Sequence, residues 1–501
     1  MPRPRIVLRP TRGLPLMTLL TADRFRLGPR TSRVLAHLRT FGGTADDQAA
    51  AWIGDDLPPL GSPSITLGGA RGSLGPHSFG FLNNLRGIAP YAAALPVRPP
   101  PGSVAIVCGR RDLLPEVAPL AIARQLGVSW IISVGDGDAA ETLAFLGEDS
   151  ATQTVLLAAS TSAASLKDLR GKSLLVLGGE PLLRAAARRA GGMAFDDLEA
   201  WLAQALLRSA GIAHRPARLA ALIAGGGAPL VRDAARNAGL AIDLQQVDDE
   251  DPDDFTQAAQ TCGGEVLLFA GGTPPPSARP TLRLDLHHPA QVRALLRALA
   301  ELEPASTTAL PPAAKVDRAY TESILEEAGT VLADHDTKRL LKAYGVAVTR
   351  QAPASSATAA TRVAAQLDYP VDLIAEHAEG APSVRRAHGV AEVRRIAAVM
   401  LQRVPFVLVR QGFPASPRAR LSIRRNKLGW VAELGGEQAL LPLRRADARV
   451  LAHAASEATD EAQLTELLLQ VATAATAHQL SLEVELFVGD IPTVVAARSQ
   501  R

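Results

Sequence analysis

Residues 219–240, LAALIAGGGAPLVRDAARNAGL, contain one complete unit of an α/β fold. The first six residues are all apolar and predict a buried strand over Leu219–Ala224. Three glycines, Gly225 to Gly227, end the strand, and apolar residues at helical spacing then predict a helix over Pro229–Ala238. A strand that passes directly into a helix is typical of a parallel sheet with helices on its faces.

The same alternation of strand and helix runs before and after this unit. Strands are expected over Val104–Cys108, Trp130–Val134, Thr154–Ala158, Ser173–Leu177 and Ala241–Gln245, and helices over Leu113–Leu126 and Ala139–Leu146. A proline-rich connector at residues 96–102 precedes the first strand, and a second Pro- and Ala-rich stretch lies at 303–314. We therefore expect two successive small α/β domains, over residues 101–205 and 206–317.

The residues from 318 onward follow a different pattern. Helices are expected over Asp334–Tyr344, Ala357–Leu367, Ala391–Arg403 and Glu461–Ala477, and strands over Pro370–Ile374, Phe406–Arg410, Arg418–Arg424, Trp430–Leu434, Leu482–Val488 and Thr493–Ala497. Gly489-Asp490 turns the last two strands into a hairpin. Consecutive strands joined by short turns predict an α+β domain with an antiparallel sheet.

The composition of the 501 residues excludes several classes of protein. The 53 basic and 50 acidic side chains give a net charge of only +3, which excludes the strong positive field of a dedicated nucleic-acid binder. The only two cysteines, Cys108 and Cys262, exclude a disulfide framework and a Cys-rich zinc module. No apolar run is long enough to span a membrane, so no membrane association is expected and the cytoplasm is the expected compartment.

The first 44 residues carry nine arginines and a single acidic residue, Asp23. Four prolines among the first fifteen residues disfavour an amphipathic helix there. We expect a solvated, partner-binding segment, with a targeting peptide as the alternative.

Four stretches, taken in order, resemble the acyl-CoA synthetases that form a nucleoside diphosphate, the superfamily of ADP-forming acetate–CoA ligase and succinyl-CoA synthetase. They are residues 75–83 (GPHSFGFLN), 127–136 (GVSWIISVGD), 219–240 and 332–346 (LADHDTKRLLKAYGV). The resemblance implies a truncated CoA-binding-like lead over 1–100, two flavodoxin-like ligase domains over 101–205 and 206–317, and a degenerate ATP-grasp domain over 318–501. It also implies CoA and ATP or ADP with Mg as cofactors, and related ligase subunits as partners in a homo- or hetero-oligomer.

In this family, as the resemblance implies, a phosphoryl group passes from ATP to a histidine and then to the acyl group that CoA captures. The stretch that matches the carrier-histidine region, residues 178–192, contains no histidine. Ile374 stands where the family has the lysine that holds the ATP phosphates. The metal-binding Asn and Asp are replaced, at Leu486 and Ala496, which leaves Glu483 and Glu485 as candidate metal ligands; two solvated glutamates are the alternative.

The resemblance also indicates residues that would contact CoA or phosphate. They are Gly75, Pro76, His77, Ser78, Gly109, Arg110, Gly225, Gly226 and Gly227. A glycine turn at the N-terminus of a helix lets backbone N–H groups approach a phosphate closely. The alternatives are a solvated helix cap at Arg110 and close strand–helix packing at the glycines.

Since the carrier histidine, the lysine and the metal ligands are missing together, the sequence predicts a relative that has lost catalysis. Such a chain would act as an accessory, regulatory or scaffolding subunit that binds CoA or a nucleotide. The first alternative is an active ligase, or an acyl or carbamoyl transferase, with displaced catalytic groups or a site completed by a partner chain. The second is an interaction module that works through the Arg-rich lead.

Overall fold

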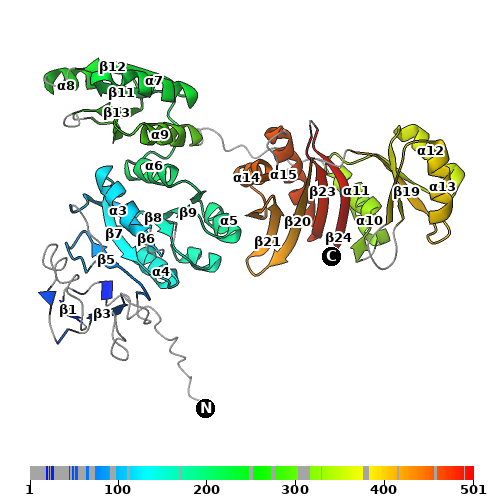
Figure 1. Ribbon diagram of the computed structural model, residues 1–501, viewed down its shortest axis with the longest axis horizontal. Coiled ribbons are helices and arrows are strands. Elements are labelled where there is room, and N and C mark those ends of the chain that lie inside the picture. The colour runs from blue at the N-terminus through cyan, green and yellow to red at the C-terminus, as the bar shows by residue number, and fades with distance from the viewer. Residues whose placement is uncertain are drawn as a thin grey trace, which may run out of the picture. The chain divides into compact units, whose positions relative to one another are not determined.

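The computed structural model divides into two compact units, Met1–Ala309 and Leu310–Arg501, which are described separately (Figure 1). The structure describes residues 19–500 except 21, 23, 28–43, 46–47, 50, 55–63, 67–73, 91–96, 110–112, 170, 248–251, 272–276, 303–315, 329, 376–382, 414–416, 456–459 and 490. Among the helices in these described parts, none is both long and apolar enough to cross a membrane.

The centre of the first unit is a six-stranded sheet of order β10-β9-β8-β6-β7-β5. Its strands are β5 (Gly80–Asn83), β6 (Pro101–Cys108), β7 (Val128–Ser133), β8 (Thr154–Ala158), β9 (Ser173–Leu177) and β10 (Met193–Phe195). All neighbours pair in parallel except β5, which runs antiparallel to β7. The helices are α3 (Leu114–Ala123), α4 (Ala140–Glu148), α5 (Pro181–Arg189) and α6 (Leu198–Ser209), with a 3₁₀ turn over Ala163–Leu169.

A second, four-stranded parallel sheet of order β12-β11-β13-β14 completes the α/β part. It contains β11 (Leu219–Ala224), β12 (Ile242–Val247), β13 (Val266–Ala270) and β14 (Thr281–Arg283), with α7 (Ala228–Asn237), α8 (Pro252–Thr261) and α9 (Pro289–Glu301). The 3₁₀ turn Gly225–Gly227 links β11 to α7. Leu207 of α6 packs in one hydrophobic core with Leu296 of α9 and with β11, so α6 lies beside α9 and joins the two sheets (Figure 1).

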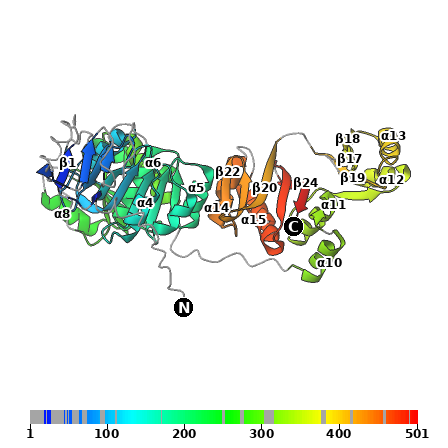
Figure 2. The same cartoon turned by 90° about the horizontal axis from the view of Figure 1, so that it is seen from below.

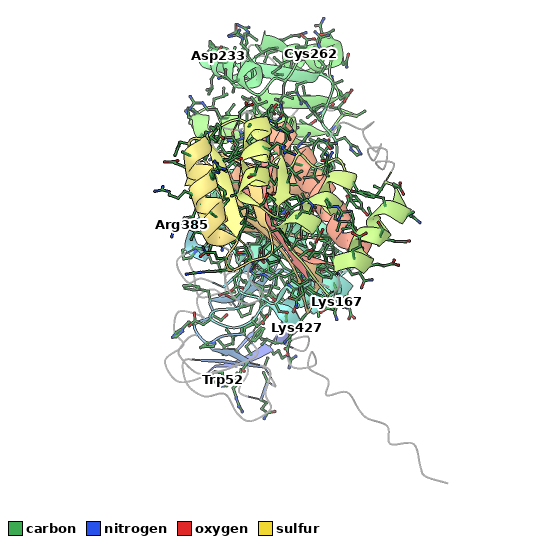
Figure 3. The ribbon with its side chains drawn as sticks, turned by 90° about the vertical axis from the view of Figure 1, so that its right-hand side faces the viewer. Trp52, Lys167, Asp233, Cys262, Arg385 and Lys427 are labelled. Carbon is green, nitrogen blue, oxygen red and sulfur yellow. The ribbon has the colours of Figure 1, made fainter. Side chains whose placement is uncertain are left out.

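Four short strands among the described residues precede β5. Strands β1 (Arg24–Leu27), β2 (Thr44–Ala45), β3 (Ala51–Gly54) and β4 (Ser64–Thr66) form a parallel sheet of order β2-β1-β3-β4. The expectation of a solvated segment over the first 44 residues is therefore wrong for β1. Phe25 lies fully buried between two exposed or half-buried arginine positions, Arg24 and Arg26, and Trp52 of β3 is also buried (Figure 3). The alternation of arginine with an apolar residue is the pattern of a half-buried strand.

The second unit contains two antiparallel sheets (Figure 2). The smaller has the order β16-β19-β17-β18 and the larger has the order β15-β24-β23-β20-β21-β22. Their strands are β15 (Val331–Leu332), β16 (Gln351–Ala354), β17 (Val371–Ala375), β18 (Ser383–Ala387), β19 (Val407–Gln411), β20 (Arg418–Asn426), β21 (Gly429–Leu434), β22 (Glu437–Leu440), β23 (Ser481–Phe487) and β24 (Thr493–Gln500).

Each sheet of the second unit buries one face against helices. Helices α12 (Ala357–Leu367) and α13 (Val390–Met400) pack on the smaller sheet, through a core that includes Val371, Leu373 and Val409. The larger sheet packs on α10 (Arg318–Ala328), α11 (Asp334–Ala343), α14 (Arg445–Ala455) and α15 (Glu461–His478). The other face of each sheet is free to carry polar residues, because side chains alternate between faces along a strand.

Candidate functional site

A cavity of about 850 Å³ opens at the carboxyl ends of β11 and β13 in the first unit. Ala224, Gly226 and Gly227 line it on one side, and Ala270 and Gly271 continue the wall across β13. The charged residues that reach it are Arg124, Glu199, Arg283, Asp285 and His287. The carboxyl edge of a parallel sheet is the usual place for a ligand in α/β proteins.

The glycine turn forms the part of the cavity with the most accessible backbone. Gly225 has a φ of +70°, a conformation that favours glycine, and a Cβ added at Gly225 or Gly226 would meet no atom within 4 Å. A Cβ at Gly227 would instead lie 2.3 Å from Leu286. Close packing therefore explains glycine at 227 but not at 226, where open space adjoins the first N–H groups of α7, which have no acceptor within the helix.

Arg124 supplies a buried positive charge to the same cavity. Its side chain is only 6% exposed, and it pairs with Glu199 of α6. Its Nε is buried without a hydrogen-bond partner. Burial lowers the pKa of Arg124, and the neighbouring charge and hydrogen bond of Glu199 oppose that shift. Arg124 is therefore a buried, paired cation in the wall of the cavity.

The opposite rim carries Arg283, Asp285 and His287. The Asp285 carboxylate lies 2.8 Å from Nδ1 of His288 and accepts a hydrogen bond from the backbone N–H of His287. Burial raises the pKa of Asp285, but these hydrogen bonds outweigh burial and hold the pKa below its ordinary value. The Asp285 carboxylate thus forms its hydrogen bonds with His287 and His288. The exposed Arg283 lies at the mouth of the cavity and contributes a positive charge there.

The predicted residues Gly75 to Ser78 form a loop that docks on the end of β7. The backbone C=O of Pro76 accepts a hydrogen bond from Asp136, and a Cβ at Gly135 would lie 1.9 Å from that same oxygen. The buried Ser78 hydroxyl donates to the C=O of Ser133 and accepts from the N–H of Gly80. Ser78 therefore fixes the loop to the sheet, and its hydroxyl is already engaged.

His77 differs from its neighbours because it faces solvent. Its side chain is 35% exposed, and its Nδ1 lies 2.7 Å from Asp136 Oδ2. The residue has a φ of +57°, which is uncommon for a non-glycine residue. A carboxylate at Nδ1 favours a proton on that nitrogen and leaves the lone pair of Nε2 available.

Gly109 ends β6 beside Ala159, and the predicted Arg110 lies outside the described residues. A cavity of about 690 Å³ lies at this edge of the six-stranded sheet, along the ends of β8 and β9. Its charged lining residues are Glu116, Glu180 and Asp196, and Asp196 forms a two-point ion pair with Arg184. Three carboxylates make this cavity a poor site for a phosphate.

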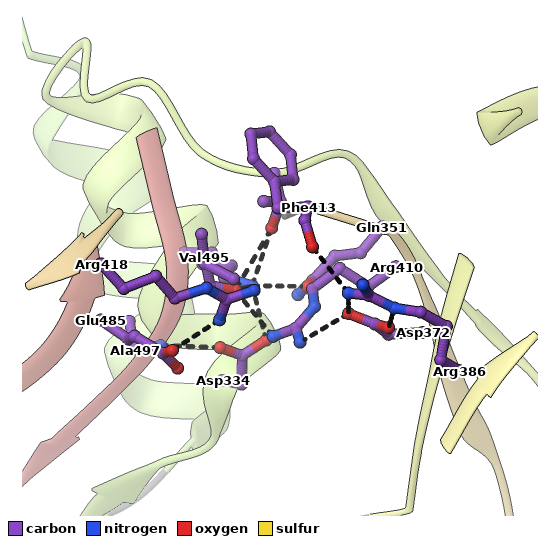
Figure 4. A network of polar contacts seen from close by, with 12 residues as sticks. Asp334, Gln351, Asp372, Arg386, Arg410, Phe413, Arg418, Glu485, Val495 and Ala497 are labelled. Carbon is purple, nitrogen blue, oxygen red and sulfur yellow. Dashed lines mark hydrogen bonds and ion pairs between the residues drawn. The ribbon is translucent and has the colours of Figure 1, made fainter. Parts of the chain in front are cut away.

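In the second unit, the residue that stands in place of the family's phosphate-holding lysine is buried. Ile374 on β17 is 3% exposed. The next residue on the same face, Asp372, is also 3% exposed and pairs with Arg386 of β18 and Arg410 of β19 (Figure 4). Arg386 is therefore part of an ion-pair network, whereas Arg385 is exposed on the neighbouring position of β18 (Figure 3).

Lys338 of α11 is the other buried cation of this region. Its side chain is 2% exposed and lies 2.9 Å from Asp334, one helical turn earlier. Its Nζ also donates to Thr349, Gln351 and the backbone C=O of Val495. These contacts tie α11 to β16 and β24, so Lys338 joins parts of the fold that are distant in sequence.

The two candidate metal ligands lie on one face of β23, as the alternation predicts. Glu485 forms an ion pair with Arg418 of β20. Glu483 is exposed and stands opposite Ser422 and Arg498 in the register of the sheet. Within the described parts of the chain, no three His, Cys, Asp or Glu residues gather closely enough to hold a metal ion. The set of residues around Glu483 and Glu485 does not fit Mg²⁺, which needs several oxygen ligands.

The sequence alone did not identify the buried charged residues of these sites. Arg124 and Arg410 come from a helix end and a strand of ordinary composition, and only the tertiary fold brings them to Glu199 and Asp372. Asp334 and Lys338 had a signal, since their spacing of four residues places them on one helix face. His287 follows β14 without any motif that marks it, and it lines the 850 Å³ cavity.

Comparison with known proteins identifies one family. The family model described as "ATP-grasp domain" matches residues 323–392. None of the curated proteins matches the chain.

Solved structures with a similar arrangement include the dinucleotide-forming acetyl-coenzyme A synthetase 1 of Ca. Korarchaeum cryptofilum in complex with coenzyme A, Ca-AMPCP and HgCl⁺, at 18% identity over 36% of this chain and 98% of that chain, with a TM-score of 0.34. The same synthetase in complex with phosphate and ADP matches at 13% identity over 57% of this chain and 96% of that chain, with a TM-score of 0.42. A protein of Pyrococcus horikoshii OT3 matches at 14% identity over 57% of this chain and 98% of that chain, also with a TM-score of 0.42.

The chain is a mixed α/β protein, its residues 323–392 match the model of an ATP-grasp domain, and it is similar to the synthetase structures named above.

Proposed function

We propose that the chain is an acyl-CoA-synthetase-like protein without ligase turnover. It acts as an accessory, regulatory or scaffolding subunit and binds a phosphate-bearing ligand of the CoA or nucleotide type. The observation that supports the loss of turnover most directly is the path of residues 178–192, where β9 passes through Gly178-Gly179 straight into α5 and no imidazole is present. Loss of a nucleophile and of electrostatic stabilisation each costs on the order of 10²-fold or more in rate.

The binding part of the proposal rests on the cavity at the end of β11. Its volume of about 850 Å³ lies in the range of small-molecule and cofactor sites. The N–H groups beside Gly226 and the exposed Arg283 reach this space from two elements, and the buried Arg124, paired with Glu199, adds positive charge to its wall. Such a combination suits a phosphate group, because it offers several hydrogen-bond donors and positive charge without a competing free carboxylate.

Binding can be tested with the full chain by calorimetric titration of CoA, acetyl-CoA and ADP. Gly226→Asp places a negative charge in the open space at the turn and should weaken binding at least tenfold. Arg232→Ala removes an exposed arginine of α7 that does not line the cavity, so it is the matched control. Undiminished binding by Gly226→Asp would reject the cavity as the site.

The loss of turnover can be tested separately with a coupled assay for ADP and CoA-thioester formation, run with and without co-purifying proteins. No thioester above the background rate is expected from the pure chain. Robust thioester formation by the pure chain would overturn the proposal that the chain has lost catalysis.

One observation favours the alternative of an active phosphoryl or acyl transferase. The His77–Asp136 pair leaves Nε2 of an exposed imidazole available as a nucleophile or base. If this group is used, incubation with γ-labelled ATP should give an acid-labile label on the peptide that contains His77. The His77→Gln variant should lose that label, and absence of label from the natural chain removes this alternative.

A further inference from the structure

The face of the smaller sheet that is turned away from its helices has a buried centre. Along β17, Val371, Leu373 and Ala375 pack against α12 and α13, so Asp372 and Ile374 point to the opposite side. On β19 the same alternation places Leu408 and Arg410 on that side. All four residues are at most 5% exposed. The centre of the face that the family resemblance assigns to the ATP phosphates is therefore covered, whereas Val384 and Arg386 of β18, on the same face, are exposed.

Asp372 lies at the centre of this face and uses both of its carboxylate oxygens. Oδ1 accepts a hydrogen bond from Nε of Arg386 at 2.8 Å, and Oδ2 accepts from a terminal nitrogen of Arg410 at 3.1 Å (Figure 4). A terminal nitrogen of Arg386 also lies 3.3 Å from Oδ2. One carboxylate thus engages two guanidinium groups from two strands, as a bound phosphate oxyanion would.

One of the two arginines connects the sheets. Arg410 donates to the backbone C=O of Val495 on β24 at 2.8 Å, whereas Arg386 donates at 2.7 Å to the C=O of Phe413, just beyond the end of β19 in the smaller sheet. Lys338, which pairs with Asp334, donates to the same Val495 oxygen at 2.6 Å. The smaller sheet is therefore fastened to the larger one through Arg410, which Asp372 neutralises.

We infer that Asp372 serves as a built-in anion that replaces a nucleotide phosphate and holds the space between the two sheets of the ATP-grasp unit closed. The unit then does not bind ATP with Mg²⁺, and it keeps its structure without a nucleotide. This inference concerns only the second unit and does not depend on a ligand in the cavity of the first.

A variant that removes the anion but keeps both cations provides the test. Asp372→Ser leaves Arg386 and Arg410 facing a small polar side chain. We expect the thermal unfolding of the variant's second unit to shift upward by several degrees in the presence of millimolar inorganic tripolyphosphate, while the natural chain shows no shift in that unit. Arg386→Gln, which removes a cation instead, is the control and should show no rescue.

The natural chain supplies a second test that needs no variant. After photolabelling with 8-azido-ATP and Mg²⁺, peptide mapping should find no label within residues 310–501. Saturable label on peptides of β17 or β19 would overturn the inference, and so would a folded Asp372→Ser chain that tripolyphosphate does not stabilise. Label confined to the first unit supports the inference and at the same time supports a nucleotide as the ligand of the proposed function.

Discussion

The two units of this chain place a buried, paired arginine in different surroundings. In the first unit, Arg124 pairs with Glu199 in the wall of a cavity of about 850 Å³, and Arg283 is exposed at the mouth of that cavity. In the second unit, Arg410 and Lys338 are neutralised by Asp372 and Asp334 and donate to the same backbone oxygen. A cation that lines a cavity can attract an anionic ligand, whereas a cation packed between two sheets contributes to architecture.

The largest effect is expected from breaking the pair in the second unit. Arg410→Ala removes the link to Val495 and leaves the buried Asp372 with Arg386 alone. Loss of one partner of a buried ion pair costs about 3–5 kcal/mol, so the second unit should unfold at distinctly lower denaturant concentration. Hydrogen exchange of its peptides during urea unfolding measures this. A loss of less than about 1 kcal/mol would show that the pair is not structural.

The next effect sharpens the contrast in the first unit. Arg124→Met keeps much of the buried stem but removes the positive charge at the wall of the cavity. We expect binding of the phosphate-bearing ligand to weaken about tenfold, or about 1.4 kcal/mol. Calorimetric titration measures the change. Arg236→Met, on the exposed side of α7, serves as a control that should bind normally.

The pH dependence of the second unit provides a smaller effect. Burial opposes ionisation of Asp372, but its hydrogen bonds to Arg386 and Arg410 and their charges outweigh burial and hold its pKa below the ordinary 3.8. Its stabilising contribution is therefore fully present above that ordinary value and is lost as the pH falls through the lower pKa of the folded state. Between pH 6 and pH 2.5, the free energy of unfolding should decrease more steeply for the natural chain than for Asp372→Asn. Parallel decreases in the two chains would contradict this.

The smallest effect is expected at an exposed pair of the same unit. Arg424 and Glu433 form an ion pair at 2.8 Å, but the Arg424 side chain is 67% exposed. Arg424→Ala should change the free energy of unfolding by no more than about 0.5 kcal/mol, because water screens such a pair. Urea unfolding of the two single variants and the double variant with Glu433→Ala measures the coupling. A coupling energy as large as the effect at the buried Arg410–Asp372 pair would show that exposed and buried ion pairs contribute equally to the stability of this unit.

Much of the regular structure follows from local patterns. The strands Thr154–Ala158, Ser173–Leu177 and Leu219–Ala224 and the helix Ala357–Leu367 have the bounds expected from their apolar spacing. The expectation failed at Arg24–Leu27, where arginines flank the buried Phe25 and conceal the strand. Phe25 packs edge-on against Phe81 of β5, with 6.3 Å between the ring centroids, and such long-range packing leaves no local signal.

The candidate sites were less predictable than the fold. Gly226 and Gly227 could be selected because a glycine turn between a strand and a helix serves either phosphate binding or close packing, and close packing accounts for Gly227. Arg124 could not, since it ends a helix far along the sequence from the turn, and its burial depends on how α6 packs. Asp372 was visible only as an acidic residue in a strand, and its two arginine partners come from β18 and β19.

The difference between the two units can be measured most directly by hydrogen exchange of the full chain, with and without saturating CoA and, separately, ATP with Mg²⁺. We predict slower exchange with CoA or nucleotide in peptides that cover residues 224–230 and 283–287, and unchanged exchange in peptides that cover 371–375 and 407–411. Protection of the β17 and β19 peptides by ATP, with no change around the glycine turn, would contradict this account.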